Sequence, residues 1–312
     1  MDKKIIAIIV VIIAIICAGA YFLGFGDNTV TIGYLPSDHD AALFVADAQG
    51  QFSANGINTK LVQFNNGGDL MTAMASGDVD VGYVGITPVL ASIEKGVPVK
   101  VISAAQTEGS GIVVSKDSGI SSVNDLSGKS IATPGEASIQ YMLLQYYLEQ
   151  NGMSLKDLKV SSMKVPSMND ALKTNKIDGM ITFEPYVTIA EKNGATVLAG
   201  SQDILPDHPC CVVVASDKFL ETHPNETSTI LEIHKNATDF VNNNTDEAAS
   251  MIPSDIVSDV EVEKTAISSF PFISGLDKYY KQDIMDFMNL EVELGVLKKP
   301  ISEENIFWEG SN

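Results

Sequence analysis

The chain has 312 residues and a net charge of −20, with 45% hydrophobic and 19% charged residues. This composition predicts a globular chain of two ordinary domains or one large one, and it excludes a disordered chain. The net charge of −20 argues against a nucleic-acid partner, because binding phosphates needs clustered basic residues. The twenty basic residues are all lysine, which removes the arginine fork that often binds anions. An anion would have to be bound by backbone N–H groups, hydroxyls, amides, histidine or lysine.

An apolar run from Ile5 to Phe25 follows two lysines near the start of the chain. About 20 apolar residues are enough to span a bilayer, and lysines before such a run favour a cytoplasmic N-terminus. We therefore expect residues 1–26 to be a signal or anchor segment that tethers an extracytoplasmic body to the cell membrane. The alternatives are cleavage after Ala20, which would give a secreted body, and lipidation of Cys17, which the large residue before it disfavours.

The first part of the body alternates predicted strands with predicted helices. Runs of β-branched and aromatic residues predict strands over 29–34, 57–64, 79–84 and 97–105. Helices are expected between them over 41–49 and 67–75, and a third begins after Thr87. This β-α-β order is typical of a mostly parallel sheet flanked by helices.

The stretch from Gly77 to Gly96 reads as a short strand, a glycine turn and a helix. Gly85 permits a sharp turn, Thr87 fits a helix N-cap and Pro88 fits the first helical position. Such a turn directs unpaired backbone N–H groups beyond the carboxyl end of the strand, where ligands bind in open α/β sheets. An ordinary strand-to-helix connection is the alternative.

The middle of the chain repeats this plan. Strands are predicted over 112–115, 130–133, 160–165, 177–182, 196–199 and 210–215, and helices over 138–152 and 168–174. Residues 78–82 and 177–181 hold equivalent places, each after a short helix. From Asp217 onward the predicted helices cover 217–222, 226–242, 246–251, 255–269, 278–295 and 302–307. We expect this helical tail to pack on one of the two sheets.

The cysteines and histidines predict no metal site and no cofactor. Besides Cys17 the chain has only the adjacent Cys210 and Cys211, from which no zinc or disulfide framework can be built, and its four histidines are scattered. The adjacent pair reads as two small residues of a semi-buried strand, with a strained vicinal disulfide as the alternative. The chain also lacks a Gly-x-Ser-x-Gly elbow, a phosphate loop and a His-Glu-x-x-His motif, so we expect no enzyme.

Five segments together resemble a known family: 33–36, 75–82, 128–135, 178–179 and 184–186. In their order and spacing the chain is similar to extracytoplasmic solute-binding proteins of ABC importers, in the nitrate, sulfonate and taurine group. The resemblance implies an α/β fold of the two-lobe, type II periplasmic-binding-protein kind. It places lobe I at 27–113 and 212–312 with the C-terminal helices, and lobe II at 114–211.

The resemblance also implies a function. Such a protein captures a small anionic or zwitterionic solute, of the aliphatic sulfonate, taurine or nitrate type, between its lobes and delivers it to an ABC permease with its ATPase. One alternative is a binding protein for an aminopyrimidine precursor of thiamine, whose relatives include a synthase that needs a cysteine-rich iron motif absent from this chain. Another alternative is a membrane-tethered solute sensor.

Ligand contacts are carried over by motif onto loops after strands and onto helix starts. The expected ligand-binding residues are Leu35, Pro36, Ser37, Asp38, His39, Gly85, Ile86, Thr87, Glu108, Gly109, Ser110, Gly135, Glu136, Ala137, Ser138, Gln140, Glu184 and Pro185. The helix starts at Thr87 and Ser138 would face each other across the cleft and present N–H groups to an anion.

Acidic residues gather at the same predicted cleft, and no lysine does. They are Asp38, Asp40, Glu108, Glu136 and Glu184. They form either a solvated rim or an inward-facing group that would favour a zwitterion, or a neutral heterocycle with donors, over a bare anion. His39 is either a pH-sensitive donor or an exposed loop residue.

Overall fold

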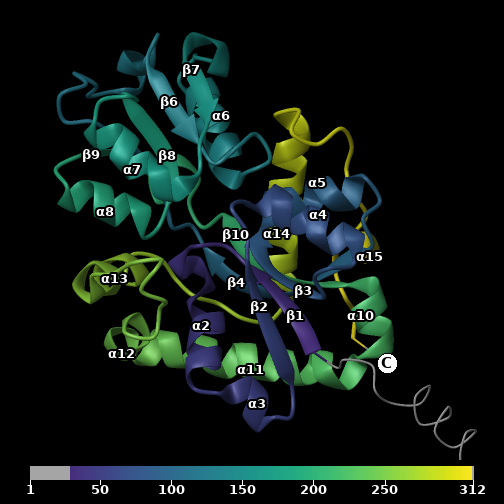
Figure 1. Ribbon diagram of the computed structural model, residues 1–312. Helices are drawn as coiled ribbons and strands as arrows, with labels where there is room; N and C mark the ends of the chain where they lie inside the picture. Colours follow the sequence, from purple (N-terminus) through teal and green to yellow (C-terminus); the bar gives the residue numbers. More distant parts are fainter. Residues whose placement is uncertain (1–28, 311–312) are drawn as a thin grey trace, which may run out of the picture.

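Two five-stranded sheets form from the short β-branched runs of the sequence, as the computed structural model describes them within residues 29–310 (Figure 1). The first sheet has the order β2-β1-β3-β10-β4 and comprises β1 (Thr29–Tyr34), β2 (Asn58–Gln63), β3 (Val81–Gly85), β4 (Val99–Thr107) and β10 (Pro209–Ser216). The second has the order β7-β6-β8-β5-β9 and comprises β5 (Ser110–Val114), β6 (Ser130–Thr133), β7 (Lys159–Ser162), β8 (Gly179–Phe183) and β9 (Thr196–Gly200). The predicted fold class, two α/β lobes, is confirmed.

The two sheets share one plan. In each, three strands pair in parallel, and a fourth pairs antiparallel to both of its neighbours. The reversed strands, β10 and β5, are the ones that enter each sheet directly from the other lobe. They enter at the edge where the parallel strands end, so they must run back against them.

An aspartate fixes the equivalent place in each half. Asp80 accepts a hydrogen bond from the backbone N–H of Thr31 at 2.9 Å, and Asp178 accepts one from the N–H of Ser130 at 2.8 Å. Asp80 lies just before β3 and binds β1, and Asp178 lies just before β8 and binds β6. Each carboxylate thus links the residue before one parallel strand to the neighbouring parallel strand. The expected repetition of the two halves therefore extends to the same side-chain contact.

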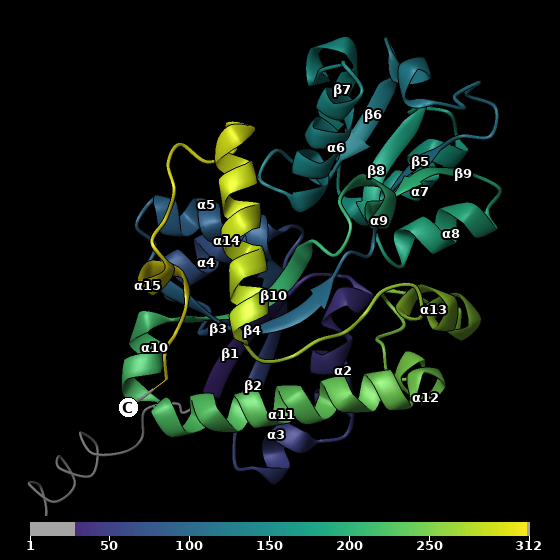
Figure 2. The same cartoon turned by 180° about the vertical axis from the view of Figure 1, so that it is seen from behind.

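The chain crosses between the sheets twice (Figure 2). The first crossing is Glu108–Gly109, between β4 and β5, and both residues have left-handed backbone angles with φ of 62° and 74°. The second lies at 205–208, between the short helix α9 (Ser201–Ile204) and β10. Both crossings precede by a few residues the lobe boundaries that the resemblance implies, between 113 and 114 and between 211 and 212.

Helices flank both sheets. Those of the first part of the chain are α2 (Ala41–Ala48), α3 (Gln51–Ala54), α4 (Gly67–Ser76) and α5 (Ile86–Glu94), with a 3-10 turn η1 (Asp38–Asp40) before α2. The second lobe carries α6 (Ile139–Gln150), α7 (Val165–Lys173), α8 (Tyr186–Lys192) and α9, with the 3-10 turns η2 (Val123–Leu126) and η3 (Leu155–Asp157). The tail consists of α10 (Asp217–Thr222), α11 (Pro224–Asn243), α12 (Thr245–Ala249), α13 (Val260–Ile267), α14 (Lys278–Glu293) and α15 (Glu303–Ile306).

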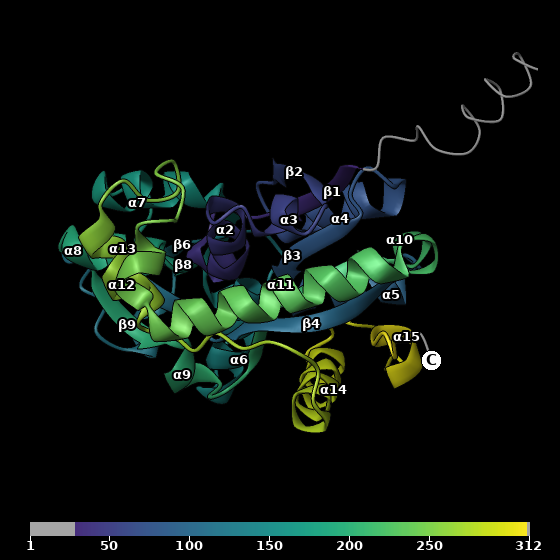
Figure 3. The same ribbon diagram turned by 90° about the horizontal axis from the view of Figure 1, so that it is seen from below.

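The tail packs mainly on the first lobe. The long helix α11 lies along α2 and β4, and α14 lies against α5 and β10 (Figure 3). One tail helix departs from the expectation of packing on one sheet, because α13 contacts both η1 of the first lobe and α8 of the second. This helix is also shorter than expected, since Asp259 caps it by accepting hydrogen bonds from the N–H groups of Glu261 and Val262.

The helix after β3 begins earlier than predicted. Its N-cap is Gly85 and its first residue is Ile86, so Thr87 is not the cap and Pro88 is the third helical residue. Proline is tolerated there because the first-turn N–H groups have no partner inside a helix. Thr87 instead points into the protein and is fully buried.

The expected signal or anchor segment at 1–26 lies outside the residues that the structure describes. Within 29–310, none of the helices combines the length and the apolar character that crossing a bilayer requires.

Gly109 should be the least replaceable residue of the first crossing. Its φ is positive, and a Cβ added there would overlap with Nε2 of His39. We expect Gly109→Ala to lower the free energy of unfolding by roughly 1–3 kcal/mol in denaturant titrations. Gly56→Ala is the matched control, because Gly56 has φ of 76° but open space around it. Equal losses in the two variants would show that the contact with His39 is unimportant.

Candidate functional site

A cavity of about 310 Å³ lies between the two lobes, beside the crossings. Its size is at the lower end of the range for small-molecule sites. Nine of the predicted residues line it, and they come from both lobes: Leu35, Ser37, His39, Gly85, Gly135, Glu136, Ala137, Ser138 and Gln140. Half of the family-derived positions thus line one partly open cavity.

Three helix starts form much of the cavity wall. Residues 66–68 precede and open α4, Gly85 and Pro88 belong to the start of α5, and 138–140 open α6. The starts of α5 and α6 come close together, since a Cβ added at Gly85 would lie 3.2 Å from Cδ1 of Ile139. Helix starts carry partial positive charge, so this wall suits an anionic group.

The other nine predicted residues do not line the cavity. Ser110 accepts a hydrogen bond from Nε2 of Gln140 at 3.0 Å, and Glu108 accepts one from the backbone N–H of Asp207 at 2.8 Å. Thr87 is buried near Glu291, whose pKa is raised to about 8 by burial. The rest outside the lining are Pro36, Asp38, Ile86, Gly109, Glu184 and Pro185.

Glu184 binds its own helix instead of facing the cavity. Its carboxylate accepts hydrogen bonds from the backbone N–H and the hydroxyl of Thr188, both at 3.0 Å. Its backbone carbonyl accepts a hydrogen bond from the Ser37 hydroxyl at 2.9 Å, which joins the two lobes. This residue therefore positions α8 and holds the lobes together at the edge of the cavity.

Ten lining residues were missed: Asn66, Gly67, Gly68, Pro88, Pro134, Ile139, Ser162, Phe183, Cys210 and Cys211. Asp40 also lines the cavity, and it was expected among the acidic residues at the cleft but not among the ligand-binding residues. Residues 66–68 follow a strand and open a helix, so they carry the same signal that identified Gly85. The cysteines end the expected lobe II at 211, and the boundary between the lobes of a two-lobe protein lies at the cleft. No comparable sequence signal marked Ser162 or Phe183.

The acidic residues expected at the mouth are mostly buried. Asp38 and Asp40 are 0% and 1% exposed, and Glu184 is buried as well, so the solvated-rim interpretation is wrong for these three. Glu136 is exposed at the cavity, and Glu108 is half-buried. Burial raises the pKa of Asp40 well above its usual value, although a hydrogen bond from the N–H of Leu35 opposes this shift.

A cluster of three buried acidic residues lies where η1, the end of β8 and α13 meet. They are Asp38 of η1, Glu184 after β8 and Glu263 of α13. The charges of Glu263 and Glu184 raise the pKa of Asp38, and that of Glu184 also raises the pKa of Glu263. Burial is the largest cause of the shifts, which bring the pKa of Glu184 to about 7 and that of Glu263 to about 8. Near neutral pH a carboxyl with a pKa of about 8 is mostly protonated and one with a pKa of about 7 is about half protonated, which lowers the cost of burying these groups.

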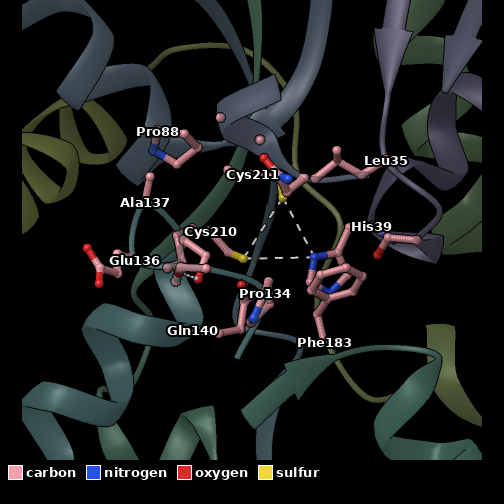
Figure 4. A pocket seen from close by; sticks show the side chains of 18 of the residues that line it. Leu35, His39, Pro88, Pro134, Glu136, Ala137, Gln140, Phe183, Cys210 and Cys211 are labelled. Atoms are coloured by element: carbon pink, nitrogen blue, oxygen red, sulfur yellow. Dashed lines mark hydrogen bonds between the residues drawn. The ribbon is translucent and has the colours of Figure 1, made fainter. Parts of the chain in front are cut away.

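His39 lies in the cavity wall beside two thiols (Figure 4). Its Nδ1 is 3.9 Å from Sγ of Cys210 and 3.6 Å from Sγ of Cys211, and the two sulfur atoms are 4.0 Å apart. The alternative of an exposed loop histidine is wrong, because only 3% of His39 is exposed. That a histidine lies beside the two cysteines was not expected from the sequence.

The neighbours of His39 fix its ring. Its Nε2 is 3.0 Å from the carbonyl oxygen of Gly109, and the ring packs between Phe183 and Phe270 at centroid distances of 5.7 and 4.9 Å. Because a carbonyl oxygen only accepts, Nε2 carries the hydrogen and donates it. In the neutral ring Nδ1 then keeps a lone pair directed toward the two thiols.

The two thiols differ in acidity. Burial opposes ionisation of Cys210, but the Cys211 thiol and His39 outweigh it and hold the pKa of Cys210 well below its usual value. The hydrogen bond with Cys210, together with burial, raises the pKa of Cys211.

Two sheets of this topology, joined by two crossings with a cavity between them, define the two-lobe periplasmic-binding-protein fold. The chain belongs to the NMT1-like family, whose sequence model matches residues 25–253. It is similar to a Bacillus subtilis (strain 168) protein named for binding aliphatic sulfonates, with 29% identity over 213 residues, 67% of this chain and 62% of that protein. It is also 29% identical over 197 residues to the taurine-binding periplasmic protein of Escherichia coli (strain K12), 62% of this chain and 61% of that one.

These matches span about three fifths of the length of the two relatives. The crystal structure of the periplasmic aliphatic sulphonate binding protein SsuA from Escherichia coli has a TM-score of 0.77 at 17% identity, over 92% of this chain and 94% of that chain. An Aspergillus parasiticus protein named 4-amino-5-hydroxymethyl-2-methylpyrimidine phosphate synthase is 29% identical over 220 residues, 65% of this chain and 63% of that protein. The first two relatives are binding proteins by name.

The acidic group at α13 should make stability depend on pH. A carboxyl whose pKa is raised by folding contributes stability that is complete below its unfolded value, near 4.5, and is lost as pH rises through its folded value, about 8 for Glu263. We expect Glu263→Gln to make this decline shallower and to raise the free energy of unfolding at pH 8.5 by on the order of 1–3 kcal/mol. Urea titrations at several pH values measure this.

The matched control is Glu261→Gln on the same helix, where the side chain is 74% exposed. Its pH profile should follow that of the unchanged protein. A Glu263→Gln profile as steep as that of the control would contradict the assignment of raised pKa values to this group.

Proposed function

We propose that this chain is the solute-binding component of an ABC importer. The observation that carries the proposal is the cavity between the lobes, walled by the starts of α4, α5 and α6. Membership of the NMT1-like family and similarity to two named binding proteins support it. Closure of two lobes over a solute is the hinge motion by which such proteins act.

A zwitterion such as an aminosulfonate fits the cavity better than a bare anion. Among the described residues that line it there is no lysine, while Asp40 and Glu136 are both present. The helix starts would receive the sulfonate, as fixed N–H donors do for anions. Asp40 and Glu136 would receive the ammonium end, which gives each part of the solute a partner of suitable charge.

The partners and location follow from the same proposal. An importer component of this kind passes its solute to a permease that is driven by an ATPase, and it works outside the cytoplasm. The apolar run from Ile5 to Phe25, preceded by two lysines, supports tethering to the cell membrane through residues 1–26. We infer binding without catalysis, since the motifs of nucleophilic, phosphoryl-transfer and zincin enzymes are absent from the sequence.

A thermal-shift panel on the full chain in detergent tests the proposal. The panel contains taurine, alkanesulfonates, nitrate, bicarbonate and an aminopyrimidine. A ligand at about 100 times its dissociation constant should add about 2.7 kcal/mol of stability, a shift of several degrees. We expect taurine to give the largest shift and nitrate to give little, because the exposed Glu136 repels a bare anion and the described lining has no lysine to attract one.

Ala137→Trp should abolish the shift, because Ala137 lines the cavity and an indole would fill the space. Ala54→Trp is the matched control, since both alanines are exposed and Ala54 is absent from the cavity lining. A shift with the aminopyrimidine alone would replace the aminosulfonate by the thiamine-precursor class. A shift that survives in Ala137→Trp would place the solute elsewhere.

A further inference from the structure

Three metal-ligating side chains meet in one wall of the cavity between the lobes. His39 comes from η1, and Cys210 and Cys211 come from the start of β10, so the group joins parts of the chain that are about 170 residues apart. All three are buried yet line the cavity, and both thiols are free. Their Nδ1 and Sγ atoms lie within 4.8 Å of one another.

The local backbone brings the two sulfur atoms to the same side. Neighbouring residues of a regular strand point to opposite faces of the sheet. Here the pairing of β10 with β4 is irregular at Pro209–Cys211 and again between Cys211 and Val212. Such bulges re-aim side chains, and they are over-represented next to functional sites. The bulge explains why adjacent cysteines can both face the cavity (Figure 4).

The spacing of the three atoms matches tetrahedral coordination. With Zn–S near 2.3 Å and Zn–N near 2.05 Å, a regular tetrahedron places two sulfur atoms about 3.8 Å apart and sulfur and nitrogen about 3.6 Å apart. The observed Sγ–Sγ distance is 4.0 Å, and the two sulfur–nitrogen distances are 3.6 and 3.9 Å. An ion could therefore enter with side-chain shifts of only a few tenths of an ångström.

Outer contacts prepare His39 to act as a ligand. The Gly109 carbonyl accepts the hydrogen of Nε2, so the lone pair of Nδ1 faces the thiols. Metal-binding histidines almost always donate their other ring N–H to such an acceptor. His208 supplies a second imidazole beside Cys210, and its Nδ1 donates to the carbonyl of Leu205 at 2.8 Å.

We propose that His39, Cys210 and Cys211 form a binding site for one thiophilic metal ion, with Zn²⁺ as the reference ion, and leave a fourth coordination position open to the cavity. Three protein ligands with one open position are typical of zinc sites that also bind a small molecule. Two thiols and one imidazole also suit other soft or borderline ions, which the choice of probes below distinguishes.

Binding is balanced by proton release. Each thiol loses its proton to water as its metal–sulfur bond forms, and the imidazole already offers a free lone pair. The resulting centre of one divalent ion and two thiolates has no net charge, so it suits a buried position better than two separate thiolates would.

The ion would give the cavity an electron-pair acceptor, at its open coordination position, that the lining side chains do not provide. The chain has no arginine, and no lysine lines the cavity among the described residues. A donor atom of the solute could then complete the tetrahedron at the open position. This last step rests on the proposed solute-binding function, whereas the metal site itself does not.

The test titrates Co²⁺ and Zn²⁺ into the full chain, in detergent and with thiols kept reduced by a phosphine. Co²⁺ reports thiolate ligands by a charge-transfer band and tetrahedral geometry by intense visible bands. We expect one ion per chain, with Zn²⁺ displacing Co²⁺. Cys210→Ser, Cys211→Ser and His39→Gln should each weaken binding by about 100-fold or more, because even outer-shell changes cost roughly 10- to 100-fold.

Two matched controls should bind metal like the unchanged chain. Cys17→Ser removes the third cysteine, and His223→Ala removes a histidine that stacks on Phe219 and is absent from the cavity lining. Melting curves without metal confirm that each serine variant is folded. The proposal is wrong if the reduced, folded chain binds no more metal than a Cys210→Ser/Cys211→Ser double variant, or if thiol counting finds both cysteines free but no charge-transfer band develops.

Azide is the probe for the open position. It should change the visible bands of the Co²⁺ form, and unchanged bands would show that a fourth protein ligand closes the site. The thermal-shift panel repeated with Zn²⁺ or with a chelator then separates the two proposals. Metal binding without any solute shift would overturn the solute-binding function alone, and a solute shift without metal binding would overturn the metal site alone.

Discussion

The structure depends on where the chain can pass from one lobe to the other. Both crossings leave and enter the sheets at the edge where the parallel strands end, which reverses β5 and β10 relative to their neighbours. The same edge collects the starts of α4, α5 and α6 and therefore the unpaired N–H groups of their first turns. Joining two sheets at these edges therefore places the cavity, the crossings and the helix starts in the same region. At the first crossing only glycine fits beside His39, because a Cβ on residue 109 would overlap with the imidazole ring. The contact between Gly109 and His39 therefore fixes both the path of the backbone and the position of a side chain in the cavity wall.

Around this junction the protein buries four acidic groups, in a chain without arginine. Asp38, Asp40, Glu184 and Glu263 are all buried near the interface between the lobes. Hydrogen bonds from Thr188 and from the N–H of Leu35 serve Glu184 and Asp40, and burial raises the pKa of all four. The interface is held together mainly by neutral contacts, such as the one from the Ser37 hydroxyl to a backbone carbonyl. Two further contacts cross it, from Gln145 to the carbonyl of Leu294 and from Lys192 to that of Glu261.

Much of this architecture could be predicted from the sequence because it is local. The strand runs, the repeated aspartates at 80 and 178 and the helix at 217–222 follow from propensity and spacing within a few residues. The resemblance to a family predicted the boundaries between the lobes to within a few residues, and it predicted about half of the residues that line the cavity. What could not be predicted depends on distant contacts. Nothing near His39 in the sequence indicates the thiols at 210 and 211, and periodicity alone would send those two thiols to opposite faces. The start of α5 was misplaced because Pro88 is tolerated throughout the first turn, so it marks the start of a helix only to within about one to three residues.

The central position of β10 in the first sheet has a consequence for synthesis on the ribosome. That sheet has the order β2-β1-β3-β10-β4, so β3 and β4 have no partner between them until residues 209–216 have emerged. The second sheet, by contrast, is built from one continuous segment that ends with β9 at Gly200. During vectorial synthesis the second lobe is therefore complete while the first still has two unpaired strand edges, which are sites of unwanted pairing in a nascent chain. The order of assembly is the reverse of the order of the lobes along the chain.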